Sequence, residues 1–121
     1  MELNLDWQTH TSSLWPEVRY DIRPLRVWAF QELLRFWETH TAAHPDQPLT
    51  SAETMGLMAV ARRVLPDHLQ NLTGITLLQA GSRQPASIES LCEETALAEL
   101  TGEIITRLVA LSAVRPEQEK N

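Results

Sequence analysis

A chain of 121 residues, 43% hydrophobic and 21% charged, has the composition of an ordinary globular domain, which excludes disordered and fibrous proteins. Its net charge of −6 repels phosphate backbones and anionic lipids, so we expect neither nucleic acid nor membrane as a partner. Cys92 is the single cysteine, and the N-terminus is acidic where a secretory signal is basic, which predicts a cytoplasmic protein.

The first 20 residues predict an N-terminal arm. Residues 3–8 alternate apolar with polar side chains, which is the period of a half-buried strand. Residues 9–20 mix turn-forming with apolar residues and show no sustained period. We therefore expect a short strand followed by an ordered segment without regular structure.

Two helices are predicted next along the chain. The first, over residues 21–41, begins at an aspartate, which is a good N-cap, and has Pro24 in its first turn, where proline is tolerated. The second, over residues 51–65, follows Thr50 and Glu53, whose spacing is that of a capping box. A stiff, proline-containing loop connects the two helices.

The middle of the chain predicts a kink and a short strand. Pro66 interrupts the helical hydrogen-bond ladder, and residues 67–72 fit one or two further helical turns. Residues 75–79 are apolar, include a β-branched pair and lie between glycines, as in a strand. A lone strand needs a neighbour, so we expect pairing with residues 3–8 or with the same segment of a second subunit across a two-fold axis.

The C-terminal part predicts helix. Apolar residues over 86–114 lie on opposite arcs in the two halves of the segment, which favours two helices or a kink, with a break near residues 96–102. Residues 115–121 form a polar tail. The predicted fold is one mostly α domain over residues 1–114, with four to five helices and at most a short two-stranded β element.

Candidate chemistry is sparse in this sequence. His40 and His44 have the four-residue spacing of a helical ligand pair, but no third ligand stands in a recognisable relation to them, so we expect no metal. Cys92 lies among apolar residues and is interpreted as an inert thiol. The glycines form no phosphate or dinucleotide motif, so no cofactor is expected. A dispersed site around Asp67 and His68 remains an alternative.

The aromatic residues are the unusual feature of the composition. All four tryptophans lie in the first 37 residues, together with Tyr20 and both phenylalanines. Helical projection places Trp28 on the polar side of its helix, near Arg35. Either the arm covers this ring with Trp15 or Leu14, or a partner protein does, because tryptophan and arginine dominate interface hot spots.

We therefore predict a non-catalytic interaction protein, an accessory, adaptor or assembly factor that binds another protein and forms a homodimer. The expected anchors and strand-pairing positions are Trp15, Tyr20, Trp28, Arg35, Ile75 and Leu77. Two alternatives remain open: a small enzyme whose site is not visible from sequence spacing, and a small-molecule binding module in which the wide apolar face of the first helix lines a pocket.

Overall fold

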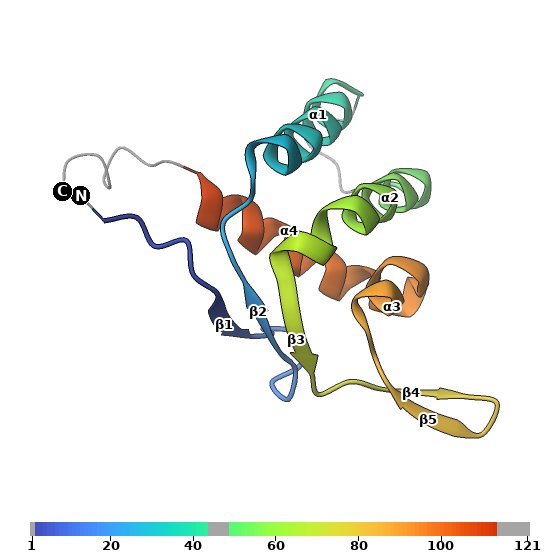
Figure 1. Cartoon of the computed structure of the whole chain (residues 1–121). Helices are drawn as coiled ribbons and strands as arrows, with labels where there is room; N and C mark the ends of the chain where they lie inside the picture. The colour runs from blue at the N-terminus through green and yellow to red at the C-terminus, as the bar shows by residue number, and fades with distance from the viewer. Residues whose placement is uncertain (1, 44–48, 114–121) are drawn as a thin grey trace.

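The computed structural model describes residues 2–43 and 49–113, which fold as an α+β structure (Figure 1). Its strands are β1 (Gln8–Thr11), β2 (Arg19–Ile22), β3 (Leu69–Thr73), β4 (Thr76–Gln79) and β5 (Ser82–Pro85). Its helices are α1 (Val27–Ala43), α2 (Ser51–His68), α3 (Ile88–Glu93) and α4 (Ala98–Ser112), with a 3₁₀ turn, η1 (Thr95–Leu97), before α4. No helix in these two ranges is both long and apolar enough to cross a bilayer.

The prediction of a mostly α domain is wrong. Within the described ranges, five strands form two antiparallel sheets, one with the order β1-β2-β3 and the other made by β4 and β5. The predicted polar tail over residues 115–121 and the loop over residues 44–48 lie outside the described residues.

The three-stranded sheet has one buried and one polar face. Tyr20 and Leu69 point into the core and are almost completely buried. On the other face, the Asp21 carboxylate accepts hydrogen bonds from Thr9 Oγ1 (2.7 Å) and Asn71 Nδ2 (2.8 Å), so it links all three strands. The bond from Thr9 first, and then that from Asn71, lower the pKa of Asp21, and burial opposes them.

This sheet overturns the predictions for the N-terminal third. The strand predicted over residues 3–8 begins only at Gln8, and the segment 9–20, predicted to lack regular structure, contains most of the β1–β2 hairpin. Asp21 belongs to β2, and α1 begins six residues later at Val27. Strand β2 also pairs with β3, which lies far from it in sequence. A contact between such distant segments leaves no mark on the local hydrophobic pattern.

Helix α2 begins as its sequence predicts. Thr50 Oγ1 accepts a hydrogen bond from the Glu53 N–H (3.1 Å), and Glu53 Oε1 accepts one from the Thr50 N–H (2.9 Å), which confirms the capping box. The helix continues to His68, past the predicted end. Pro66 is exposed in the last turn. Of the helical turns predicted for residues 67–72, only Asp67 and His68 are helical, and the prediction is wrong from Leu69 on because β3 begins there.

The strand predicted over residues 75–79 is confirmed as β4, but its partner is β5 and neither predicted neighbour. Ala80 and Gly81 form the tight turn of this hairpin with positive φ angles of 52° and 77°. In the C-terminal part, the two predicted helices are confirmed as α3 and α4. The break runs from Glu94 through η1 and overlaps the start of the predicted region, residues 96–102, whereas Gly102 lies inside α4.

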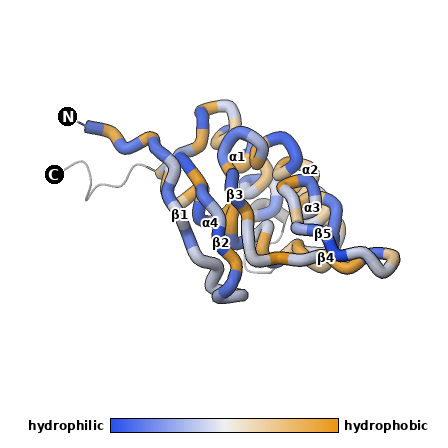
Figure 2. The backbone as a smooth tube through the Cα atoms, turned by 60° about the horizontal axis from the view of Figure 1, so that its bottom comes forward, coloured by the Kyte–Doolittle hydropathy of each residue, from blue (hydrophilic) through white to orange (hydrophobic). Residues whose placement is uncertain are grey.

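The core lies where the helices meet the inner face of the three-stranded sheet. Leu100, Ile104 and Leu108 of α4 are completely buried, and α2 packs against α1, α3 and α4. The hydropathy colouring in Figure 2 shows that strands and helices both alternate apolar and polar residues, as elements with one buried side do. The β4–β5 hairpin projects from this body (Figure 1).

Two glycines give a test of the fold. A Cβ on Gly74, whose φ is +91°, would lie 2.0 Å from the Glu17 carbonyl oxygen, whereas a Cβ on Gly102 would meet no atom within 4 Å. We expect Gly74→Ala to lower the free energy of unfolding by about 2 kcal/mol or more. Gly102→Ala, inside a helix, should raise it by about 0.5–1 kcal/mol. Urea denaturation measures both, and equal effects of the two changes would contradict this chain path.

Candidate functional site

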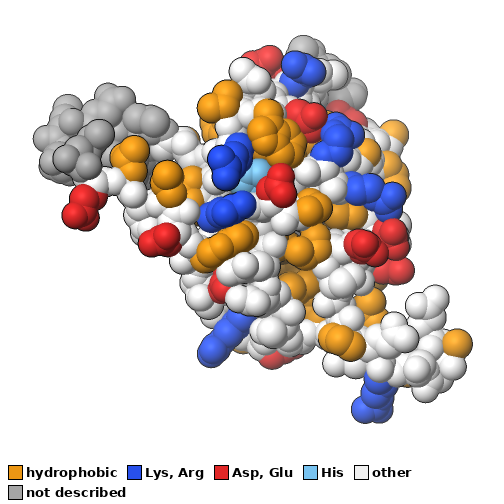
Figure 3. All heavy atoms as spheres, viewed as in Figure 1, with side chains coloured by type: hydrophobic (Ala, Val, Ile, Leu, Met, Phe, Trp, Pro, Cys, Tyr) orange, Lys and Arg blue, Asp and Glu red, His pale blue; other side chains and the backbone are white. Residues whose placement is uncertain are grey.

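The exposed side of α1 carries an unusual number of large apolar side chains. Val27, Trp28 and Leu34 are 74%, 41% and 41% exposed. At 100° per residue they lie on one arc together with Arg35, and Arg26 precedes them at the start of the helix. We call these five residues the Trp28 surface. Figure 3 shows orange side chains flanked by blue ones in the region where α1 begins.

His68 lies beneath this surface and is completely buried. Its Nδ1 donates to the Val64 carbonyl oxygen (2.7 Å), and its Nε2 accepts a hydrogen bond from the Arg26 N–H (3.0 Å). This pattern requires the neutral ring with its proton on Nδ1. The ring centroid of Trp28 is 5.9 Å from that of His68, with the planes tilted by 58°. The end of α2 therefore supports both the first turn of α1 and the indole on it.

The same junction is fixed by Arg23. Its Nε donates to the Asp67 carbonyl oxygen (2.7 Å), its backbone N–H donates to the His68 carbonyl oxygen (3.3 Å), and its guanidinium lies 4.6 Å from the centroid of the Trp7 ring. The connection between β2 and α1 is thereby tied to the end of α2. The backbone under the Trp28 surface is consequently well defined.

The Trp28 surface includes two arginines although the protein is acidic. Arg26 and Arg35 are both exposed, and neither guanidinium forms an ion pair with a described residue. By contrast, Arg63 Nε lies 3.0 Å from Glu32 Oε2 and is partly neutralised. The unpaired arginines make this surface a local cationic region on a chain of net charge −6.

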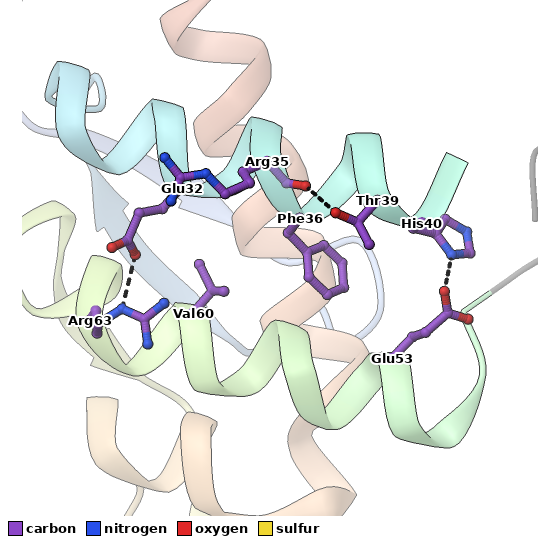
Figure 4. Close-up of a pocket in the computed structure, with 8 residues that line it drawn as sticks. All are labelled: Glu32, Arg35, Phe36, Thr39, His40, Glu53, Val60 and Arg63. Carbon is purple, nitrogen blue, oxygen red and sulfur yellow. Dashed lines mark hydrogen bonds and ion pairs between the residues drawn. The ribbon is translucent and has the colours of Figure 1, made fainter. Parts of the chain in front are cut away.

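A groove with a volume of about 270 Å³ lies beside this surface, between α1 and α2 (Figure 4). His40 Nδ1 hydrogen-bonds the Glu53 carboxylate at one end, and Arg63 pairs with Glu32 at the other. The hydrogen bond with His40, and to a smaller extent that from the Thr50 N–H, lower the pKa of Glu53 to about 2. The residues that line the groove are Phe36 and Val60 between the helices, with Glu32, Arg35, Thr39, His40, Glu53 and Arg63 around them.

Tyr20 is not a surface anchor. It is completely buried, its hydroxyl donates to Glu103 Oε2 (3.0 Å), and it accepts a hydrogen bond from Arg107 Nη1 (2.6 Å). Burial first, and then the contact with Glu103, raise the pKa of Tyr20 well above its usual value. Glu103 also accepts bonds from the Ser13 N–H (2.7 Å) and hydroxyl (2.6 Å). This network joins the first hairpin to α4 and leaves the phenol inaccessible to a partner.

The structure separates the other predicted site residues. Trp15, Ile75 and Leu77 are partly buried and pack against the core, so none belongs to the Trp28 surface. Trp28 is partly exposed, so the alternative that the arm seals it does not hold. Sequence reasoning missed Val27 and assigned Leu34 to the wide apolar face of the first helix, although the seven-residue spacing of the two places them on one helical face.

Alternative chemical sites find little support in the geometry. His68 uses both ring nitrogens within the fold, so the dispersed site around Asp67 and His68 does not form. Burial raises the pKa of the Cys92 thiol. Among the described residues, no three histidine, cysteine or acidic side chains are grouped closely enough to bind a metal. No protein-family model, curated protein or solved structure matches this chain.

His68 predicts a loss of stability in mild acid. Burial lowers the pKa of His68 below 6.5, and Arg23 and Arg26 add to this, while the Val64 carbonyl and Asp67 oppose it. Above pH 6.5 the ring is neutral in both the folded and the unfolded chain, so its full contribution to the free energy of unfolding is present. As the pH falls below 6.5, the unfolded chain takes up a proton that the folded chain does not, so the free energy of unfolding decreases.

We expect His68→Gln to reduce this slope, which for one proton is at most about 1.4 kcal/mol per pH unit. The measurement is urea denaturation between pH 7.5 and pH 5. His10→Gln is the matched control. Burial also lowers the pKa of His10, but that ring is partly exposed, so His10→Gln should change the slope less than His68→Gln does. An unchanged slope in His68→Gln would contradict the assigned role of this residue.

Proposed function

We propose that this protein is a non-catalytic binding module, of the accessory or adaptor type, that docks another protein on the Trp28 surface. The observation that carries the proposal is that Trp28 is 41% exposed and yet lies against the fully buried His68 ring. An indole that is both accessible and supported from below loses little conformational entropy when a partner covers it.

The chemistry of this surface favours an acidic partner segment with apolar side chains. Val27 and Leu34 flank the indole and would bury further apolar area on contact. Arg26 and Arg35 are free to form charge-assisted hydrogen bonds with carboxylates. Their unpaired charges increase the association rate with an anionic surface, and salt should weaken the complex.

Substitution of Trp28 tests the proposal. A partner recovered with the immobilised protein from its native cell is identified, purified and titrated by calorimetry. We expect Trp28→Ala to weaken binding at least about 30-fold, the loss typical of a hot-spot residue, and Arg26→Glu to weaken it with a reduced salt dependence.

Leu78→Ala provides the matched control, because Leu78 is a large, 71% exposed apolar residue on the projecting hairpin, away from α1. Its affinity should equal that of the unaltered protein. If Trp28→Ala binds as tightly as Leu78→Ala does, docking on the Trp28 surface is wrong. Circular dichroism of each variant excludes a loss of folding as the cause.

A second candidate function is the binding of a small anionic molecule in the α1–α2 groove. The specific observation is that Arg35 lines this groove without an ion-pair partner among the described residues. A volume of about 270 Å³ suits a ligand smaller than most cofactors. Small carboxylates or phosphates should then raise the melting temperature of the protein. Loss of this effect in Arg35→Ala, but not in Trp28→Ala, would favour this candidate over protein docking.

A cytoplasmic location stays a prediction alongside this proposal. Its support is the single cysteine, Cys92, which cannot form an internal disulfide. The homodimer likewise stays a prediction at this point, since the docking of a different protein on α1 does not require it.

A further inference from the structure

The N-terminal segment has the pattern of a strand but no strand partner. Residues 2–7 precede β1 and belong to no sheet. Leu3 and Leu5 are 70% and 65% exposed, although their alternation with polar residues is that of a strand with one buried face. Figure 2 shows this alternation as orange and blue bands on the segment that leads from the N-terminus to β1.

The sheet cannot extend along this segment within one molecule. The last pair of the β1–β2 ladder is Gln8 with Ile22, and the next position on β2 is Arg23. The Arg23 N–H is already bonded to the His68 carbonyl oxygen, and Pro24, one residue further, has no N–H to donate. Residues 2–7 therefore leave the sheet unpaired, with a bend at Asp6.

We propose that the segment Leu3–Trp7 pairs antiparallel with the same segment of a second copy of this chain, with the two-fold axis at Leu5. In this register Leu5 lies opposite its own equivalent, and Leu3 lies opposite Trp7 of the second copy. Directly opposite residues share one face of a sheet, so all the apolar side chains meet on the same side.

Charge selects this register over its neighbours. Centred on Leu5, the pairing places Asn4 opposite Asp6 and Glu2 opposite Gln8. Centred on Asn4, it would place Glu2 opposite Asp6, and centred on Asp6 it would place two aspartates in direct opposition. Like charges opposite each other destabilise a strand pair, and a shift by one residue places apolar opposite polar side chains.

The base of the segment is already positioned for this pairing. Trp7 is fixed against the Arg23 guanidinium at 4.6 Å, so the segment leaves the body in a defined direction. In the free chain the Asp6 N–H donates to Asn4 Oδ1 (3.1 Å), a local bond that an inter-strand bond would replace. Leu5 lines a pocket together with Arg26 and Val27 of the Trp28 surface. The strand pairing itself does not use Trp28, so a variant of Trp28 separates the two proposals.

Disulfide trapping tests the register. Leu5→Cys and Leu3→Cys are each made in a Cys92→Ser background and oxidised in a glutathione buffer. Directly opposite Cβ atoms lie about 5 Å apart, close to disulfide geometry, whereas the two Leu3 positions would be about 14 Å apart along the strands. We therefore expect Leu5→Cys to form the covalent dimer at least about tenfold faster than Leu3→Cys does.

Leu3 is a matched control because its exposure is nearly that of Leu5, so random collision would cross-link both alike. Equal rates, a faster Leu3→Cys reaction, or no dimer from either variant would overturn the proposal. Adding Trp28→Ala to the Leu5→Cys variant should leave the rate unchanged, which separates this dimer from docking on α1. Light scattering of the unaltered protein should show a concentration-dependent dimer that Leu5→Asp abolishes.

Discussion

A buried, neutral histidine connects three parts of this fold. The His68 ring accepts the Arg26 N–H at the start of α1 and donates to Val64 in α2, and the His68 backbone carbonyl receives the Arg23 N–H as β3 begins. The two bonds of the ring together require an uncharged ring whose proton is on Nδ1. The direction of α1, the end of β2 and the position of the Trp28 indole all follow from this arrangement.

The same junction decides which surfaces remain unpartnered. The bond from Arg23 to the His68 carbonyl ends the ladder between β1 and β2, which leaves Leu3 and Leu5 exposed on an unpaired segment. It also starts α1 with Val27 and Trp28 turned outward. We propose that partners cover these exposed apolar groups, which the fold itself fixes in place.

The sequence predicted those features that depend on interactions between residues close together in the chain. The capping box of Thr50 and β4 are decided within a few residues, and both are confirmed. The first hairpin was missed because residues 9–20 show no sustained alternation. The pairing of β2 with β3, about 50 residues away, has no local signal, as in the Asp21–Asn71 bond. Helical projection suffices to place Trp28 on the polar side of α1. The burial of Tyr20 depends on contacts with α4 that lie more than 80 residues away.

The central claim is that Trp28 is presented to solvent on a rigid support. Acrylamide quenching of tryptophan fluorescence tests it most directly, with the unaltered protein compared with Trp28→Phe. We expect a readily quenched, red-shifted component that the variant lacks, because the other three indoles are only partly accessible. Identical quenching of the two proteins would contradict it, since Trp28 would then be no more exposed than the rest.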